Sequence, residues 1–151
     1  MPKRLAKFGL EVAVEKTQLL RFDRNSKLSF EFLGFEFYWG RGRWSNIILQ
    51  RRTSRKKYRA ALANLTACCQ DHCRLPKRVL FAQLNRKLRG YWNYFGIRGN
   101  YASLSDYFYH ATTTLLKCFN RRSQKRSYTW PGFRALLRVF PLAKPRICHD
   151  F

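Results

Sequence analysis

Six cations crowd the segment from Arg51 to Arg59, and their type and spacing fit the binding of phosphate groups. They are Arg51, Arg52, Arg55, Lys56, Lys57 and Arg59. No acidic residue lies among them, and like charges four residues apart on a helix repel one another. Guanidinium and ammonium groups gain free energy when they neutralise the phosphates of a nucleic acid. The segment therefore predicts a phosphate-binding surface, with a merely solvated face as the alternative.

A second group of candidate residues recurs at helical spacing further along the chain. Arg86, Arg89 and Asn93 share one face of an expected helix, and Trp92 lies at its flank. Cations and an amide beside an aromatic ring can contact a sugar-phosphate surface or a splayed base. An indole is more often part of a hydrophobic core, so core packing is the alternative for Trp92.

A third group opens the polar segment after residue 120. Arg121 and Arg122 stand there together with Lys125 and Arg126. Non-specific phosphate contact and simple solvation fit this segment equally well, so Arg121 and Arg122 are weaker candidates for RNA binding.

Three cysteines and a histidine between residues 68 and 73 have the residue types of a zinc site. On a helix, Cys69 and Cys73 point one way, whereas Cys68 and His72 point another. Zinc needs four ligands that converge tetrahedrally, and the sequence has no second pair at ligand spacing. We therefore expect thiols without a metal.

The acidic residues offer no pattern for an independent catalytic site. The aspartates are Asp23, Asp71, Asp106 and Asp150, and none is adjacent to another. The sequence also lacks a Gly-rich phosphate loop and a Ser–His–Asp arrangement. It predicts no catalytic residues and no cofactor.

The elements that must position these groups fall into two parts. The first part has aromatic residues at strand spacing, with Phe35, Phe37 and Trp39 on one face. From Arg51 onward the apolar period is that of helices. We expect a short helix over 4–8, strands over 18–22, 30–39 and 44–49, and helices over 54–73, 76–95, from 103 to about 119, and 130–140. This pattern predicts an α+β fold, a small antiparallel meander followed by a bundle of three to four helices.

The charge is divided as unevenly as the elements are. The 151 residues carry a net charge of +23, and 46% are hydrophobic, which is enough for a core and excludes disorder throughout. Residues 1–50 hold 9 basic and 5 acidic groups, whereas residues 51–151 hold 22 and 3. We predict domains at 1–50 and 51–141 and an irregular tail at 142–151, with the polyanionic partner at the second domain.

Other classes of protein are disfavoured by the same sequence. No apolar run is long enough for a transmembrane helix, and the first residues lack the apolar segment of a secretory signal. Five cysteines, an odd number, do not form the framework of a secreted disulfide-rich domain. We expect a cytoplasmic protein with reduced thiols and no membrane partner.

Four stretches occur in the order and spacing of a known family. Residues 9–17 are similar to a palm segment that follows the catalytic aspartates, and residues 32–35 to a primer-grip hairpin. The basic helix start at 54–57 is similar to the beginning of a thumb, and residues 84–95 to its most distinctive segment. In register over residues 4–140, the chain resembles the C-terminal part of group II intron-encoded reverse transcriptases, the maturases.

The resemblance implies a palm edge followed by a thumb, also called domain X, that binds structured intron RNA and assists its folding or splicing. It also implies contact with an RNA/DNA duplex as a further possibility. In such enzymes an adjacent aspartate pair holds the polymerase metals, and this sequence has no such pair. The fingers, most of the palm and the endonuclease module of many relatives are also expected to be absent, so the chain is expected to be catalytically incomplete.

Two other functions stay open at this point. The chain could be the thumb subunit of a split RNA-directed DNA polymerase whose partner supplies the fingers and the catalytic palm. It could also be a decayed gene fragment without a selected function.

Overall fold

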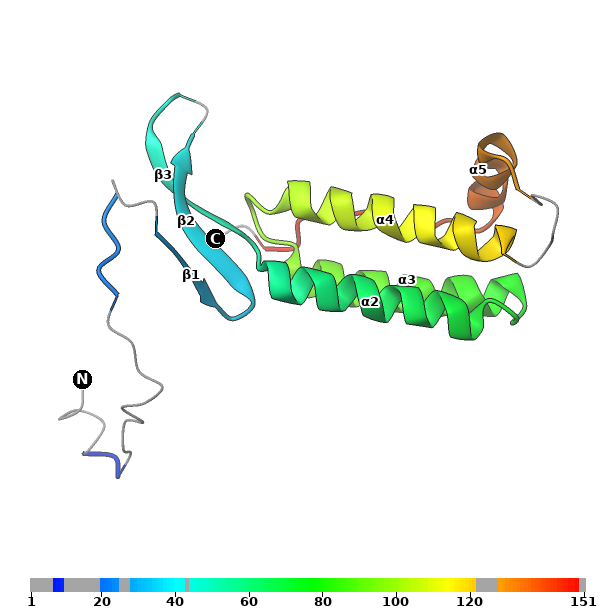
Figure 1. Cartoon of the computed structure of the whole chain (residues 1–151), viewed down its shortest axis with the longest axis horizontal. Coiled ribbons are helices and arrows are strands. Elements are labelled where there is room, and N and C mark those ends of the chain that lie inside the picture. Colours follow the sequence, from blue (N-terminus) through cyan, green and yellow to red (C-terminus); the bar gives the residue numbers. More distant parts are fainter. Residues whose placement is uncertain (1–6, 10–19, 25–27, 43, 122–127, 150–151) are drawn as a thin grey trace.

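The chain has an α+β fold in which a three-stranded antiparallel sheet precedes four helices, counted over the described residues (Figure 1). A computed structural model describes residues 7–9, 20–24, 28–42, 44–121 and 128–149. The elements are β1 (Ser29–Phe32), β2 (Phe35–Arg41), β3 (Ile47–Thr53), α2 (Arg55–His72), α3 (Lys77–Phe95), α4 (Tyr101–Asn120) and α5 (Trp130–Val139). The predicted fold class is confirmed.

The single strand predicted over residues 30–39 is in fact two strands joined by a tight turn. Leu33 and Gly34 both have positive φ, 49° and 79°, and glycine adopts this conformation without steric cost. The turn folds β1 back onto β2, so that Phe30 pairs with Phe37 and their rings stack at 5.2 Å. The prediction of one long strand was wrong, because a glycine within a strand-forming run can form the turn between two strands as well as a β-bulge within one strand.

The other strand boundaries also differ from the prediction. The strand predicted over 44–49 begins at Ile47 and continues to Thr53, so the helical period starts later than Arg51. Residues 20–22, part of a predicted strand, have no strand structure, and residues 18 and 19 lie outside the described residues. Of the predicted helix over 4–8, only residues 7 and 8 are described, and they lie in a turn.

The helices begin and end close to their predicted positions. The predicted apolar stripe of α3 is buried, with Leu80, Leu84 and Leu88 at its centre. The predicted stripe of α4 is likewise buried, apart from Phe108, which is half-buried. However, α4 begins at Tyr101 instead of Ser103, and its N-cap residue is Asn100, whose side chain makes no capping hydrogen bond.

The core lies between α2, α3 and α4. Helices α2 and α4 run in the same direction, and α3 runs in the opposite direction, from the end of α2 back to the start of α4 (Figure 1). Tyr91 of α3 stacks on Tyr107 of α4 with ring centroids 4.0 Å apart, and Trp92 meets Tyr107 edge to face. The core of this bundle is therefore aromatic at the end near the sheet.

The tail after Pro141 is irregular, as predicted, and it packs along α3. Asn85 brackets it: the side-chain amide donates to the Pro141 carbonyl at 2.9 Å and accepts from the Ala143 amide at 2.7 Å. Farther on, the Cys148 amide donates to the Gly96 carbonyl, and a Cβ at Gly96 would lie 2.7 Å from the Arg146 carbonyl. Glycine at this position permits the close approach of the two backbones.

Asn100 joins the sheet to the bundle. Its side chain accepts from the Thr53 amide at 3.0 Å and donates to the Thr53 hydroxyl and the Phe95 carbonyl, each at 2.9 Å. Both Asn100 and Thr53 are buried, so these bonds satisfy groups that water does not reach. Across the same junction, Phe35 of β2 stacks on Tyr94 of α3.

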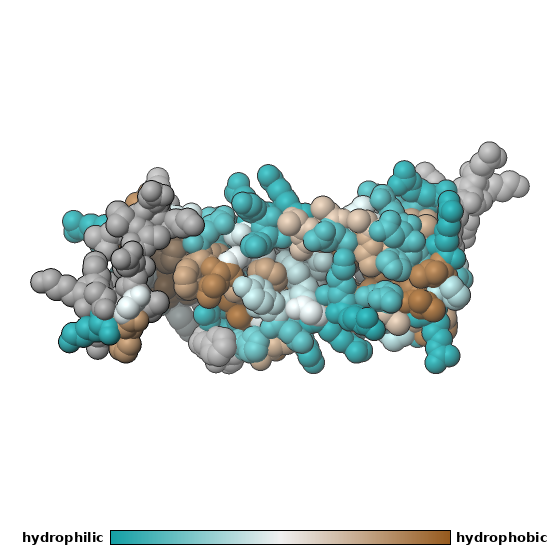
Figure 2. Space-filling model, turned by 90° about the horizontal axis from the view of Figure 1, so that it is seen from below, coloured by the Kyte–Doolittle hydropathy of each residue, from teal (hydrophilic) through white to brown (hydrophobic). Residues whose placement is uncertain are grey.

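No helix in the described part of the chain is both long and apolar enough to cross a bilayer. Hydrophilic side chains cover much of the face seen in Figure 2, with hydrophobic patches near the sheet and at the opposite end of the helices.

Candidate nucleic-acid interface

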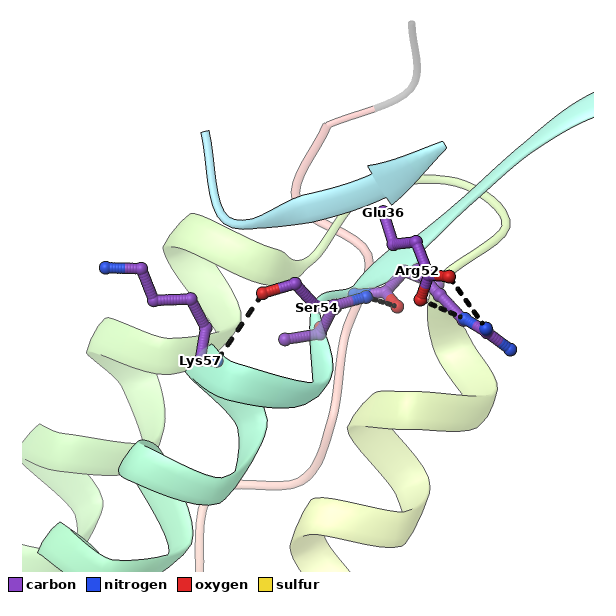
Figure 3. Close-up of polar contacts among 6 residues, drawn as sticks. Glu36, Arg52, Ser54 and Lys57 are labelled. Atoms are coloured by element: carbon purple, nitrogen blue, oxygen red, sulfur yellow. Dashed lines mark hydrogen bonds and ion pairs between the residues drawn. The ribbon is translucent and has the colours of Figure 1, made fainter. Parts of the chain in front are cut away.

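The start of α2 is fixed by Ser54, which ends the strand and caps the helix. The buried Ser54 hydroxyl accepts from the Lys57 amide at 3.4 Å, while the Ser54 amide donates to the Gly34 carbonyl at 2.9 Å (Figure 3). A serine at this position is typical of a helix N-cap. It holds the first turn of the helix against the β1–β2 turn, and the side chains of that first turn are consequently held at the sheet.

The first turn of α2 carries cations where helices usually carry acids. Arg55, Lys56 and Lys57 are all exposed there, and no acidic residue occurs in this turn. The amide ends at a helix N-terminus are partially positive, so cations at this position are electrostatically unfavourable by themselves. An anion bound at this end would remove that penalty, and the arrangement therefore favours phosphate.

Arg52 occupies the last part of β3 and is held by Glu36 of β2. Its Nε and Nη2 donate to the two carboxylate oxygens of Glu36 at 2.8 and 3.0 Å, and its guanidinium lies 4.9 Å from the centre of the Tyr38 ring (Figure 3). The hydrogen bond from Arg52 lowers the pKa of Glu36 below its usual value. Arg52 is therefore a fixed cation that is partly neutralised.

Arg51 and Arg52 point to opposite faces of the sheet because both lie on a strand. Arg51 pairs across the ladder with Phe37 and lines a hollow with Arg98. Arg52 lines a different pocket, shared with the start of α2. The sequence predicted one cationic surface that includes Arg51, Arg52 and Arg55. This prediction is wrong for Arg51, which lines a different hollow.

The pocket on the Arg52 side, called here the junction pocket, has a volume of about 270 Å³. It is lined by Arg52, Thr53, Arg55, Tyr58, Arg59, Ser103 and Asp106. Three arginines from β3 and α2 thus converge on one depression. Planar guanidinium groups bind phosphate oxygens through paired hydrogen bonds, so this is the best phosphate site among the described residues.

The carboxylate in the junction pocket is already engaged. The Tyr58 hydroxyl donates to Asp106 Oδ2 at 2.5 Å, and His110 Nε2 lies 3.8 Å from the other oxygen. Burial, together with the hydrogen bond to Asp106, raises the pKa of Tyr58 well above its usual value. The tyrosine therefore keeps its proton and its bond to Asp106. Because Arg52 is already paired with Glu36, Arg55 and Arg59 supply the positive charge in the pocket that remains for an anion.

The second predicted group, on α3, is only partly available. Arg86 and Arg89 are exposed, as predicted. Asn93 is exposed too, but its side-chain carbonyl accepts from Arg146 Nη2 at 3.2 Å and from the Cys148 thiol at 3.6 Å. Its amide therefore helps to hold the tail.

The prediction that Trp92 contacts RNA is wrong, and the core alternative holds. Its side chain is 0% exposed, and its Nε1 donates to the Ala143 carbonyl at 3.0 Å. No face of the indole is open for a base to stack on. The helical wheel placed Trp92 at the flank of α3, but the sequence did not reveal that the tail covers this flank.

The third predicted group lies at the opposite end of the bundle. Arg121 is exposed and follows the last residue of α4, whereas Arg122 lies outside the described residues. Arg121 follows Asp106 of the junction pocket by 15 residues along α4, so about 22 Å separates the two along the helix. The structure does not bring these cations together with those of α2.

Sequence reasoning missed several residues that surround Arg121. Arg74, Lys117 and Trp130 line hollows at that end of the bundle together with it. The sequence did contain one signal for this group: Lys117 and Arg121 are four residues apart, which makes them neighbours on the surface of one helix. Trp130 was assigned to the start of a helix without a function.

The cysteines do not form a metal site in the described part of the chain, where no three or more Cys, His, Asp or Glu side chains are grouped to hold an ion. Cys69 is fully buried, and that burial raises the pKa of its thiol to about 12. A thiol that keeps its proton is a poor metal ligand and a poor nucleophile.

Comparisons with protein-family models, curated proteins and solved structures find no match, so the resemblance to maturases stays a prediction.

Proposed function

We propose that this chain binds structured RNA, with the junction pocket and the first turn of α2 as its principal contact. The single observation that carries the proposal is the convergence of Arg52, Arg55 and Arg59 on one pocket at a helix start that has no acidic residue. Structured RNA presents phosphates and 2′-hydroxyls in a fixed shape, and a rigid helical surface reads such features.

The RNA is a group II intron, and the chain assists its folding or splicing in the cytoplasm. The order of the four similar sequence stretches supports this part of the proposal, and so does a small sheet that leads directly into a basic helix. Arg86 and Arg89 add a second, weaker phosphate contact on α3. The chain catalyses no polymerisation by itself, because its sequence has no adjacent aspartate pair.

The test is binding of the purified chain to a folded group II intron RNA and to duplex DNA of similar length, over a range of salt concentrations. If about six phosphates are neutralised, the logarithm of the binding constant falls with the logarithm of salt at a slope of about −4 to −5. We expect a preference for the intron RNA that persists at physiological salt.

A pair of double variants locates the contact. Arg55→Ala with Arg59→Ala should flatten the salt slope by about 1.4 to 1.8, since each of the two lost phosphate contacts removes about 0.7 to 0.9. Arg134→Ala with Arg138→Ala removes the same charge from exposed positions on α5 and should leave the slope nearly unchanged. Equal effects of the two pairs, or equal binding of RNA and DNA that vanishes at moderate salt, would reduce the chain to a non-specific polycation, the behaviour of a decayed fragment.

One observation favours the thumb subunit of a split RNA-directed DNA polymerase as a second candidate. In the described residues β1 and β3 each pair on one side only, and Phe32, Ile47 and Leu49 are about half exposed. An open edge and an apolar surface suit the addition of further strands from a partner chain. Primer extension that requires this chain together with one carrying the fingers and the aspartate pair would establish that role.

A further inference from the structure

A groove of about 830 Å³ lies between α2 and α4 at the end farthest from the sheet. Its lining includes Thr66, Gln70, Thr113, Lys117, Arg121 and Trp130. A smaller hollow of about 370 Å³ shares Gln70 and Arg121 with it and adds Arg74. The two form one depression, called here the distal groove.

The distal groove combines positive charge with an exposed aromatic ring. Arg74, Lys117 and Arg121 are all exposed, and no acidic residue is among those that line either hollow. Trp130 is 45% exposed, and its ring meets the fully buried Phe133 edge to face at 6.1 Å. The buried ring orients the indole while part of its surface faces solvent.

The uncharged polar side chains that line the distal groove differ in whether they are free to bind a ligand. The hydroxyls of Thr66 and Thr113 already donate to the Leu62 and Tyr109 carbonyls within their own helices. Gln70 is exposed and offers both an amide donor and a carbonyl acceptor to a ligand.

Helical geometry places the distal groove on the same seam as the junction pocket. Residues 11 apart on a helix are separated by three turns and differ by only about 20° in direction. Arg59 in the junction pocket and Gln70 in the distal groove have this separation on α2, and so do Asp106 and Lys117 on α4. The two sites are therefore about 16 Å apart along the seam.

We propose that the distal groove binds an unpaired nucleotide of an RNA whose paired part lies at the junction pocket, an inference that rests on the proposed function. The base stacks on Trp130, Lys117 and Arg121 contact the flanking phosphates, and Gln70 meets the edge of the base. Nucleic acid combines a flat π-face with closely spaced anions, and aromatic rings beside cations bind its single strands without strict sequence preference. An acidic protein segment would use the cations but not the ring.

The experiment compares three RNA hairpins that share a stem of about ten base pairs, enough to cover α2. One is blunt, one has an overhang of a few unpaired nucleotides, and one has the same overhang without bases. We expect the overhang with bases to tighten binding about tenfold over the blunt hairpin, and the abasic overhang to give only a small part of this gain.

Variants assign the gain to the groove. Trp130→Ala should abolish the gain while binding of the blunt hairpin stays unchanged, and Trp130→Phe should keep most of it because a stacking ring remains. Lys117→Ala with Arg121→Ala should also reduce it. Trp44→Ala is the matched control, because Trp44 is 84% exposed in the β2–β3 loop and lies outside the groove.

The outcomes separate the two proposals. Blunt-hairpin binding without any gain from the overhang would overturn the distal site and leave the proposed function intact. An equal gain from the abasic overhang would show that the groove binds charge alone, as for an acidic protein segment, and would also overturn it. Failure of all three hairpins to bind would overturn both proposals.

Discussion

The sheet and the helical bundle differ in how completely they bury their apolar side chains. In the bundle, Leu80, Trp92 and Tyr107 are almost fully buried. In and beside the sheet, Leu33, Trp44 and Leu49 are half exposed or more. Burial of apolar surface is the main source of folding free energy. Among the described residues, the core lies in the bundle, and the strands of the sheet add no fully buried apolar side chain to it.

The sheet therefore depends on the bundle for its position. At one end, the sheet is connected to the bundle by the Asn100 side chain, which bonds to Thr53, and by the Ser54 amide, which donates to the Gly34 carbonyl. The ion pair of Arg52 with Glu36 braces β3 against β2 beside these contacts. The junction pocket lies among these links. Its geometry consequently depends on how firmly the sheet is attached.

The largest expected effect compares one tryptophan from each region. Trp92→Ala should lower the free energy of unfolding by about 3–5 kcal/mol, because it empties a fully buried site and leaves the Ala143 carbonyl without its donor. Trp44→Ala should change it by less than about 0.5 kcal/mol, because that side chain is 84% exposed. Chemical denaturation followed by helical circular dichroism measures both.

A milder variant keeps this comparison usable if Trp92→Ala fails to fold. Trp92→Phe retains a ring and should cost less than the alanine variant. Similar losses from Trp92→Ala and Trp44→Ala would contradict the view that stability resides in the bundle.

The next effect concerns the attachment of the sheet. Asn100→Ala removes three hydrogen bonds and leaves the buried Thr53 amide without an acceptor, which should cost about 2–3 kcal/mol. Hydrogen exchange should speed up at β3 more than at the centre of α3. The exposed Asn64→Ala on α2 is the control. An even increase of exchange over the whole chain would show that the sheet and the bundle unfold as one unit.

Much of the bundle could be predicted from the sequence, because burial on a helix leaves a strong periodic signal. The helix bounds of α3 and α4 were predicted to within about two residues, and the apolar stripes of both helices are buried apart from the half-buried Phe108. The sheet was harder, although the alternation of aromatic residues changes phase between Phe32 and Phe35, as expected where a strand is interrupted. The resemblance of residues 32–35 to a primer-grip hairpin also implied a turn, and the positive φ of Leu33 and Gly34 shows it between β1 and β2.

The candidate site was predictable in its residue types more than in its geometry. The cationic segment was evident, but the strand character of Arg51 and Arg52 sent their side chains to opposite faces. Trp92 was misplaced because the tail, which has no periodicity, covers it. The distal groove depends on α2 and α4 being side by side, a tertiary fact that no local pattern contains.

A smaller effect compares helix caps at the two ends of the molecule. Ser54→Ala removes the cap of α2 and should cost about 1 kcal/mol, with the loss concentrated at the junction with the sheet. Thr129→Ala removes the cap of α5, whose hydroxyl accepts from the Gly132 amide at 3.5 Å, and should cost no more than this. Ser54→Ala should also weaken binding of the blunt RNA hairpin, which occupies the junction pocket alone, and Thr129→Ala should not. Equal effects on RNA binding would show that the position of the first turn of α2 is irrelevant to the interface.

The smallest effect is the pH dependence of the ion pair that braces the sheet. Because Arg52 lowers the pKa of Glu36, the pair stabilises the folded chain above the usual carboxyl pKa of 4.5, and this contribution is lost as the pH falls through the lower folded value. Glu36→Gln should therefore destabilise the chain at neutral pH by less than about 1 kcal/mol, since 41% of the Arg52 side chain is exposed. The difference between wild type and variant should shrink toward zero on acidification. Glu31→Gln, at the exposed cross-strand neighbour, removes the same charge and serves as the control. If the wild-type advantage over Glu36→Gln were constant from neutral to acid pH, the ion pair would contribute nothing to holding the sheet, and the attachment would rest on the contacts of Asn100, Ser54 and Tyr94.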